Sequence, residues 1–317
     1  MRIVVLDGYT LNPGDNPWDP IAELGELVVY DRTPVHLIVE RARGAEILLT
    51  NKTPITSSSL AQLPDLRFIA VLATGYDVVD VHAARARGVV VANVPEYSTS
   101  SVAQHTFALL LELCHRVGVH DQVVHGGCWA ACPDFSFWLQ APVELQDMKL
   151  GIVGFGRIGR RVAQIGSALG MHVLATGPRQ PSDLPTSVQW VALADLFRQA
   201  DVVSLHCPLT PANERFVNAA LIALMKPGAF LINTARGRLI DEGALADALR
   251  SGRLAGAAVD VVSEEPIRKD NPLLTAPNCI ITPHMAWASL AARRRLMLAT
   301  AENIRAFLRG APVNVVW

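Results

Sequence analysis

The chain has 317 residues, 50% of them hydrophobic, and its 28 Lys and Arg residues nearly balance its 29 Asp and Glu residues, giving a net charge of −1 at pH 7. This length suffices for two domains with sizeable cores, and the charge balance argues against a protein that uses a basic surface to bind nucleic acid or an anionic membrane. No apolar run reaches the roughly 18 residues of a membrane span, and the N-terminus is typical of a strand rather than a signal peptide. We therefore expect a cytoplasmic protein that begins at Met1.

The cysteines do not indicate a disulfide framework or a metal centre. There are five of them, scattered along a chain without a secretion signal, which predicts reduced thiols. His125, Cys128 and Cys132 lie close in sequence, but no second pair of ligands completes a four-ligand set. No metal site is expected.

In the first part of the chain, short apolar runs alternate with helical patterns. This alternation predicts a parallel sheet with helices on both of its faces, and the expected strands lie at 3–6, 27–30, 47–50, 68–72 and 89–92. The pattern breaks at residues 94–98, after which Ser100 or Ser101 can cap a long apolar helix over 102–116. A loop rich in Trp, Cys, Pro and Phe is expected over 125–142.

A glycine motif opens the next part of the chain. Gly154, Gly156 and Gly159 have G-x-G-x-x-G spacing between an expected strand at 149–153 and an expected helix at 157–169. In a dinucleotide-binding unit such glycines allow a tight turn, close approach of the pyrophosphate and packing of the helix on the strand. The motif predicts that the turn binds a nucleotide through Gly154, Phe155, Gly156, Arg157, Ile158 and Gly159.

The end of the following strand bears on the choice of cofactor. It reads Thr176-Gly177-Pro178-Arg179 and lacks the acidic residue that binds the ribose hydroxyls of NAD, and the nearest acid is Asp183, beyond Pro181. An Arg at this position can pair with a 2′-phosphate. We expect Thr176, Gly177 and Arg179 to contact the cofactor, with NADP favoured over NAD; the alternative is that Arg179 is a solvated loop residue.

Further strands are expected at 201–205, 228–233, 255–259 and 279–282, followed by an amphipathic helix within 288–309 and a strand at 313–316 that return to the first lobe. The predicted fold class is α/β, with two doubly wound parallel-sheet domains. One is a flavodoxin-like substrate domain made of residues 1–97 and 288–317, and the other is a Rossmann nucleotide-binding domain over 98–287. The chemistry is expected at the carboxyl ends of the strands, in the crevice between the lobes.

Three charged residues are candidates for this chemistry: Arg236 and His284 follow expected strands, and Glu265 lies in a loop before Pro266. Each alone has an ordinary explanation, as an Arg that caps carbonyl groups, a Glu on a solvated loop and a His bonded to a neighbouring carbonyl. Together with the glycine motif, their order resembles the D-isomer-specific 2-hydroxyacid dehydrogenase family. The resemblance covers essentially the whole chain, with signature stretches at 200–210, 225–237 and 259–266, while 51–53, 72–77 and 284–287 look most like the glycerate dehydrogenase, or hydroxypyruvate reductase, branch.

The resemblance implies an NAD(P)-dependent enzyme that reduces a small 2-oxo acid, of the hydroxypyruvate or glyoxylate type, to the D-2-hydroxy acid. His284 would be the acid/base, a role that suits a His near neutral pH. Glu265 would favour the imidazolium form of His284, and Arg236 would bind the substrate carboxylate with its planar fork. His206 could be a second base, but its place before Cys-Pro at a strand end favours a structural role.

The resemblance also assigns the remaining contacts. For the substrate, the backbone N–H groups of Thr74 and Gly75 would receive the carboxylate, Asn51 and Lys52 would close the pocket, and Trp287, with Trp138 and Phe135, would wall it. For the cofactor, Asp260 would hold the nicotinamide carboxamide, and the other contacts would be Thr234 and Ala235 along the nicotinamide and Cys207 and Pro208 near the adenosine. The small-molecule acid is the expected partner, and the helix over 102–116 with its adjoining loop is expected to form a homodimer.

Two other readings stay open. A nucleotide-sensing corepressor of the same fold would bind NAD(H) without turnover, because a fold does not prove a function. The second alternative is a dehydrogenase for another substrate class, such as formate or phosphite. A formate enzyme would have a Gln in place of Glu265, so the Glu in this sequence counts against it.

Overall fold

A computed structural model describes residues 1–316, which fold into two compact units. The second unit is Thr99–Ala286, and the first is formed by the chain on either side of it. Each unit is built on a parallel sheet whose two faces are both covered by helices. The predicted fold class, α/β with two doubly wound parallel sheets, is confirmed.

The first unit has a five-stranded sheet in the order β2-β1-β3-β4-β5, which is the flavodoxin-like order. Its strands are β1 (Arg2–Val5), β2 (Glu26–Val29), β3 (Ile47–Thr50), β4 (Phe68–Val71) and β5 (Val90–Ala92). Successive residues of the central strands point to opposite faces and are buried on both, as expected where helices cover both sides.

Helices of the first unit divide between the two faces of its sheet. One face packs against α1 (Asp19–Ala22) and α11 (Leu290–Leu308), where the rings of Phe68 and Phe307 stack with centroids 4.6 Å apart. The other face packs against α2 (Ile38–Ala42), α3 (Ser57–Ala61) and α4 (Val81–Ala86). Two 3-10 helices complete the unit, η1 (Gly8–Thr10) and η2 (Val35–Leu37).

The second unit has a seven-stranded sheet in the order β12-β11-β10-β9-β6-β7-β8. Its strands are β6 (Lys149–Val153), β7 (His172–Thr176), β8 (Val188–Trp190), β9 (Val202–Leu205), β10 (Ala229–Asn233), β11 (Leu254–Val259) and β12 (Cys279–Ile281). The strand order reverses between β6 and β9, so the crevice for a ligand lies outside the carboxyl ends of these strands.

Two apolar cores flank this sheet. One contains side chains of α5 (Thr99–His115) and α7 (Arg157–Ala168), and the other contains side chains of α8 (Leu193–Gln199), α9 (Ala219–Ile222) and α10 (Glu242–Arg250). The connecting 3-10 helices are η3 (Pro211–Asn213), η4 (Gly237–Leu239) and η5 (Pro272–Thr275).

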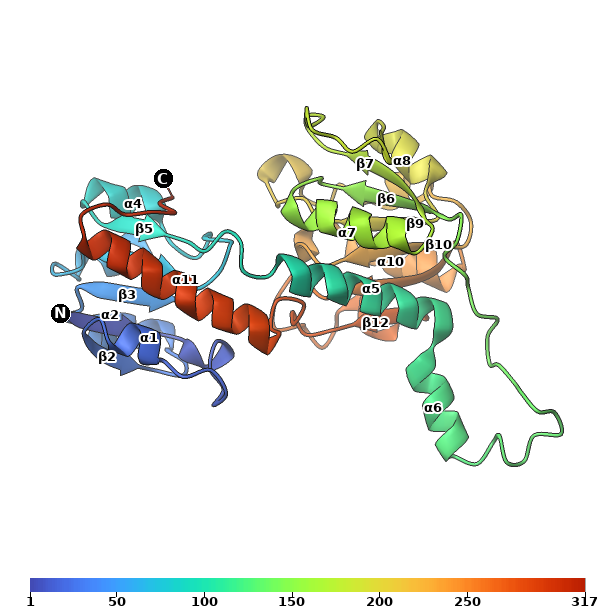
Figure 1. Cartoon of the computed structure of the whole chain (residues 1–317), viewed down its shortest axis with the longest axis horizontal. Coiled ribbons are helices and arrows are strands. Elements are labelled where there is room, and N and C mark those ends of the chain that lie inside the picture. Colours follow the sequence, from blue (N-terminus) through green and yellow to red (C-terminus); the bar gives the residue numbers. More distant parts are fainter. Residues whose placement is uncertain (317) are drawn as a thin grey trace. The chain divides into compact units, whose positions relative to one another are not determined.

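Residues 117–142, which we call the arm, differ from the rest of the second unit. They begin with α6 (Val117–His125), which has no buried residue, and Figure 1 shows α6 and the segment after it projecting away from the sheet of this unit. Their exposed large apolar side chains are Val117, Val119, Val124, Trp129, Phe135, Trp138 and Leu139.

The structure departs from the predicted elements in four places. The sequence pattern predicted neither α6 nor β8. The strand predicted at 313–316 is wrong within the described residues, because there the chain forms only an isolated antiparallel bridge between Ala92 and Val315. Ser101 is not a helix cap; it lies inside α5, and its Oγ donates to the carbonyl of Ala286 at 2.7 Å.

Candidate active site

The three predicted catalytic residues follow neighbouring parallel strands of the second unit. Arg236 comes after β10, Glu265 after β11 and His284 after β12. Because the carboxyl ends of parallel strands meet at one edge of a sheet, the order of these strands brings three distant stretches of sequence to the same edge.

His284 and Glu265 form a short hydrogen bond. The Nδ1 atom of His284 lies 2.6 Å from the Oε2 atom of Glu265, and the two side chains retain 26% and 33% of their exposure. A carboxylate only accepts hydrogen bonds, so Nδ1 carries the proton and Nε2 is the nitrogen left to exchange a proton with a reactant. His284 also has a φ of 52°, a left-handed conformation that its surroundings must hold in place.

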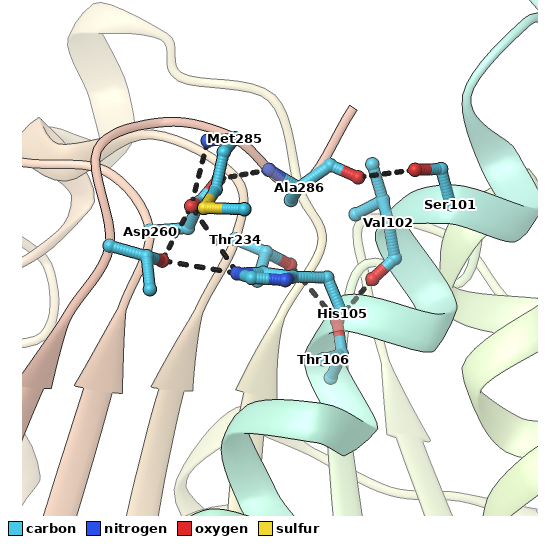
Figure 2. A network of polar contacts seen from close by, with 9 residues as sticks. Ser101, Val102, His105, Thr106, Thr234, Asp260, Met285 and Ala286 are labelled. Carbon is cyan, nitrogen blue, oxygen red and sulfur yellow. Dashed lines mark hydrogen bonds and ion pairs between the residues drawn. The ribbon is translucent and has the colours of Figure 1, made fainter. Parts of the chain in front are cut away.

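Asp260 anchors the loop that carries His284. Its Oδ1 accepts hydrogen bonds from the Thr282 hydroxyl at 2.6 Å and the Met285 N–H at 2.9 Å, and its Oδ2 accepts one from the Ala286 N–H at 2.9 Å (Figure 2). The carbonyl of Asp260 also receives the N–H of His284 at 2.8 Å. Burial opposes ionisation of Asp260, but the hydrogen bonds from His105, Thr282 and the loop outweigh it and lower the pKa of its carboxyl.

Asp260 is also predicted to hold the nicotinamide carboxamide. Its side chain has 0% exposure, and both carboxylate oxygens accept hydrogen bonds from the protein. In the structure Asp260 therefore holds the loop on either side of His284, and its contact with the nicotinamide stays a prediction.

A second carboxylate, Glu242, anchors the loop that carries Glu265. It accepts hydrogen bonds from the N–H and hydroxyl of Ser263 at 2.7 and 2.6 Å and from the Asn271 amide at 3.0 Å. Sequence reasoning did not select Glu242 as a site residue. In the structure Asp241 is the cap of α10, so Glu242 is available for the loop.

Arg236 is half-buried and makes one side-chain hydrogen bond, to the carbonyl of Ala235 at 2.8 Å. Within residues 1–316 it has no ion-pair partner, so most of its donors remain available for an anion. Its neighbour Gly237 has to be glycine, because a Cβ there would lie 1.9 Å from the backbone of Val262. This close approach packs the loop of Arg236 on the segment after β11.

The glycine turn has the geometry that nucleotide binding requires. Gly154 has a φ of 96°, and a Cβ there would lie 2.5 Å from the backbone nitrogen of Cys207. A Cβ on Gly159 would lie 2.2 Å from the Gly154 carbonyl oxygen, whereas one on Gly156 would meet nothing within 4 Å. Gly156 is the N-cap of α7 and supplies no side-chain cap, so the helix N-terminus is open to a phosphate.

The other residues predicted at the turn lie as follows. The Phe155 side chain is in the core, with the guanidinium of Arg160 5.0 Å from its ring centre, so only its backbone can face a ligand. Arg157 is exposed and Ile158 is half-buried, both in the first turn of α7. Cys207 and Pro208 follow β9, and burial raises the pKa of the Cys207 thiol.

The segment after β7 carries a cation, Arg179, and an ion-paired acid, Asp183. Thr176 is buried, Gly177 packs near Trp190, and Arg179 is exposed, with no hydrogen bond or ion pair to any other residue that the structure describes. The Asp183 carboxylate accepts a hydrogen bond from Arg160 at 2.7 Å, and this bond holds the pKa of Asp183 below its usual value.

His206 and the residues after β10 belong to the sheet edge rather than to the His284 pair. The Nε2 of His206 lies 2.8 Å from the Ser204 hydroxyl, and burial lowers the pKa of His206 to about 3. His206 is therefore neutral near pH 7, which supports a structural role. Thr234 is buried with its hydroxyl 3.2 Å from that of Thr106, and Ala235 donates its N–H to the Asn233 side chain.

In the first unit the predicted substrate residues lie on two linked loops. The Asp7 carboxylate, which sequence reasoning did not select, accepts the backbone N–H groups of Asn51, Lys52 and Thr53 at 2.8, 2.6 and 2.7 Å. The Asn51 amide then donates to the carbonyl of Leu72 at 3.2 Å. Asn51 is buried and Lys52 is exposed.

The loop after β4 presents free donors. Thr74 is fixed by its hydroxyl, which donates to the Val94 carbonyl at 2.9 Å, and by its own carbonyl, which accepts from Asn93 at 2.6 Å. No acceptor among the described residues receives the N–H of Thr74 or Gly75. These two groups can therefore bind an anion.

The predicted aromatic wall is spread over separate elements. Trp287 packs against the core of the first unit, edge-on to Tyr97 with ring centroids 6.2 Å apart. Phe135 and Trp138 lie on the arm and are 92% and 64% exposed.

The described residues contain neither a cluster of metal ligands nor a helix that could span a membrane. Between residues 1 and 316, no three His, Cys, Asp or Glu side chains are grouped to hold a metal ion. None of the helices in that range combines the length and apolar character needed to cross a membrane.

Comparison with known proteins decides the family. The model of the D-isomer specific 2-hydroxyacid dehydrogenase, NAD binding domain, matches residues 107–286, more than half of the chain. The chain belongs to this family. The predicted family is thus confirmed, and the match places an NAD-binding domain within the second unit.

Individual relatives agree with this assignment. The chain is 50% identical to a hydroxypyruvate reductase of Blautia hydrogenotrophica, over 100% of this chain and 99% of the relative. It is 42% identical to a glycerate dehydrogenase of Methylorubrum extorquens, over 88% of each chain. A solved acyclic imino acid reductase in complex with NADPH and D-Arg is similar over 100% of both chains, with a TM-score of 0.85 and 31% identity.

Proposed function

We propose that this dehydrogenase reduces a small 2-oxo acid, of the hydroxypyruvate or glyoxylate type, to the D-2-hydroxy acid. The observation that carries the proposal is the 2.6 Å hydrogen bond between His284 and Glu265 at the strand edge that also holds Arg236. The similarity to a hydroxypyruvate reductase and a glycerate dehydrogenase supports the choice of substrate.

His284 acts as the acid and base. The nicotinamide, when bound, supplies or takes up the hydride. As negative charge develops on the carbonyl oxygen of the substrate, the Nε2–H of His284 donates its proton to that oxygen. Glu265 stabilises the imidazolium that is needed before this step, and in the oxidation direction it stabilises the imidazolium that forms.

Arg236 binds the substrate carboxylate. Its guanidinium has several uncommitted donors in a fixed plane, which suits two parallel hydrogen bonds to a carboxylate better than a Lys ammonium would. In the first unit we assign the free N–H groups of Thr74 and Gly75 to the same carboxylate, on the family resemblance. Asn51 and Lys52 shape the neighbouring loop, and Trp287 limits the size of the substrate.

The cofactor binds at the turn from Gly154 to Gly159, with Thr234, Ala235, Cys207 and Pro208 lining the sheet edge. The residues present fit the group, because the N-terminus of α7 has no side-chain cap and space is open at Gly156. We favour NADP over NAD. Arg179, after β7, has no ion-pair partner among residues 1–316, and the charge of Asp183, which could repel a 2′-phosphate, is compensated by Arg160.

We also propose that the enzyme is a homodimer formed through α5 and the arm. The arm exposes a group of large apolar side chains, and exposed apolar patches of this kind mark interaction surfaces. Sedimentation equilibrium yielding the mass of a monomer at micromolar concentration would refute this assignment.

The first test is to mix the purified protein with hydroxypyruvate or glyoxylate and to follow oxidation of NADPH and NADH side by side. Turnover that favours NADPH and becomes equal for both cofactors in Arg179→Ala supports the function and the cofactor assignment. Turnover that favours NADH keeps the function and removes the role of Arg179. Cofactor binding without turnover of either acid points to another substrate class or to a nucleotide sensor.

A further inference from the structure

One face of α5 contacts the loops that carry the catalytic candidates. Ser101 donates to the carbonyl of Ala286, and Thr106 lies against Thr234 in the loop that leads to Arg236. Between them His105 reaches the loop of His284, with its Nε2 3.1 Å from the Thr282 hydroxyl and 3.4 Å from Asp260 Oδ1 (Figure 2). This face of α5 therefore contacts both the loop that leads to Arg236 and the loop that carries His284.

The direction of these hydrogen bonds follows from their lengths and chemistry. The Thr282 hydroxyl is 2.6 Å from the Asp260 carboxylate, which can only accept, so the hydroxyl proton points to Asp260. The Thr282 oxygen must then accept from His105, and the proton of His105 lies on Nε2. Asp260 thus accepts hydrogen bonds from the Thr282 hydroxyl and from the backbone N–H groups that follow His284. His105 of α5 supports Asp260 both directly and through Thr282.

We propose that His105 is a positioning residue for His284. It supports Asp260 and Thr282, which hold the segment from 282 to 286, and this support keeps the backbone of His284 in its left-handed conformation with Nε2 facing the reactant. His105 lies 179 residues before His284 and does not bond to it directly; its effect passes through Thr282 and Asp260. The proposal rests on the proposed function, because it concerns the proton transfer assigned to His284.

The geometry also distinguishes positioning from simple packing. The side chain of His105 is 18% exposed and contacts the polar groups of Thr282 and Asp260, whereas the apolar contacts of α5 include those of Phe107, Leu110 and Leu113. A side chain that served only to fill space there would be replaceable by any residue of similar volume. One that supports Asp260 must place a donor where Nε2 now lies.

The test compares three variants of His105 in the full-length enzyme. Gln places an amide N–H donor near the position of the His Nε2, Asn places one near Nδ1, and Ala supplies none. We expect His105→Ala and His105→Asn to lower kcat by about tenfold or more, because small misplacements of a proton donor are costly, while the dissociation constant for NADPH changes little. His105→Gln should recover most of kcat. His172→Ala, an exposed His at the start of β7, is the matched control and should behave like the wild type.

Two further readouts separate this role from a loss of folding. The kinetic isotope effect with deuterated NADPH should rise in His105→Ala, because the chemical step becomes slower than product release. Hydrogen exchange at the amides of Met285 and Ala286 should be faster in His105→Ala than in the wild type and normal in His105→Gln. Equal kcat in the Gln and Asn variants, or a fall in kcat matched by the loss of folded protein, would overturn the proposal.

The exchange measurement needs no substrate. If the wild type fails to reduce either 2-oxo acid, the proposed function fails, and the exchange rates of the two amides still decide whether His105 holds the loop. If the wild type is active and the exchange rates of the Ala variant match it, only the positioning role is refuted.

Discussion

Replacement of Glu265 by Gln isolates the contribution of a single negative charge. Gln keeps the size of Glu and a carbonyl oxygen that can accept the Nδ1–H of His284, so the 2.6 Å contact can persist without its charge. A hydrogen bond to a charged group contributes about 1.5–3 kcal/mol. The side chains of His284 and Glu265 are 26% and 33% exposed, so water screens part of the interaction between them. The lower end of that range, about 1.5 kcal/mol, corresponds to a change in rate of roughly tenfold.

We therefore expect Glu265→Gln to lower kcat for 2-oxo acid reduction by about tenfold, with little change in cofactor binding. The assay is stopped-flow oxidation of NADPH under single-turnover conditions, which reports the chemical step. Glu264→Gln is the matched control, because Glu264 is the adjacent residue and its nearest ionic partner is Arg268 at 3.6 Å. Equal rates for the wild type and Glu265→Gln, or equal losses in both variants, would refute the reasoning.

Three further predictions test separate parts of the structure. Arg236→Lys should raise KM for the 2-oxo acid by about tenfold or more, since an ammonium cannot form the two parallel bonds of the guanidinium, and an unchanged KM would contradict a carboxylate-binding role. Asp7→Asn should lower the free energy of unfolding by about 2 kcal/mol in urea titrations, because three backbone N–H groups lose a charged acceptor, and Asp31→Asn is the control. Burial raises the pKa of Cys114 to about 11 and that of Cys279 to about 12, so both thiols are protonated at pH 8. Both should therefore resist alkylation by iodoacetamide in the native protein and react once urea unfolds it. Rapid alkylation of either thiol in the native protein, detected by mass spectrometry, would show that this thiol is not buried.

The strands of both sheets could be predicted because they are short apolar runs between helices. β3 was expected at 47–50 and occupies Ile47–Thr50, and β6 was expected at 149–153 and occupies Lys149–Val153. β8 was missed because only Val188 of its three residues is buried, so it carries almost no apolar signal. α6 was missed for a related reason, since no residue of it contacts a core.

The candidate site was predictable only as far as its charged residues follow strands. Arg236 and His284 stood out because each follows an expected strand, and the catalytic roles of these two residues and of Glu265 were assigned from the resemblance to the family. The acids that hold the site loops could not be found in this way, because they are distant in sequence from those loops: Asp7 binds the Asn51 loop of the first unit, 44 to 46 positions away, and Glu242 binds Ser263 in the loop of Glu265, 21 positions away. Such pairs become visible only once the chain has folded. Asp7 did leave one signal, as an acid directly after the first strand.

The segment Thr99–Ala286 contains the His284–Glu265 pair, Arg236, the buried acid Asp260 and the half-buried acid Glu242. The hydrogen bonds by which Asp260 and Glu242 hold the loops of the pair are all made within this segment. A sequence change in the first unit therefore leaves these hydrogen bonds in place. If the loops around Asn51 and Thr74 bind the substrate as proposed, exchanging them for those of another family member should change which acid is accepted while the loops of His284 and Glu265 keep their supports.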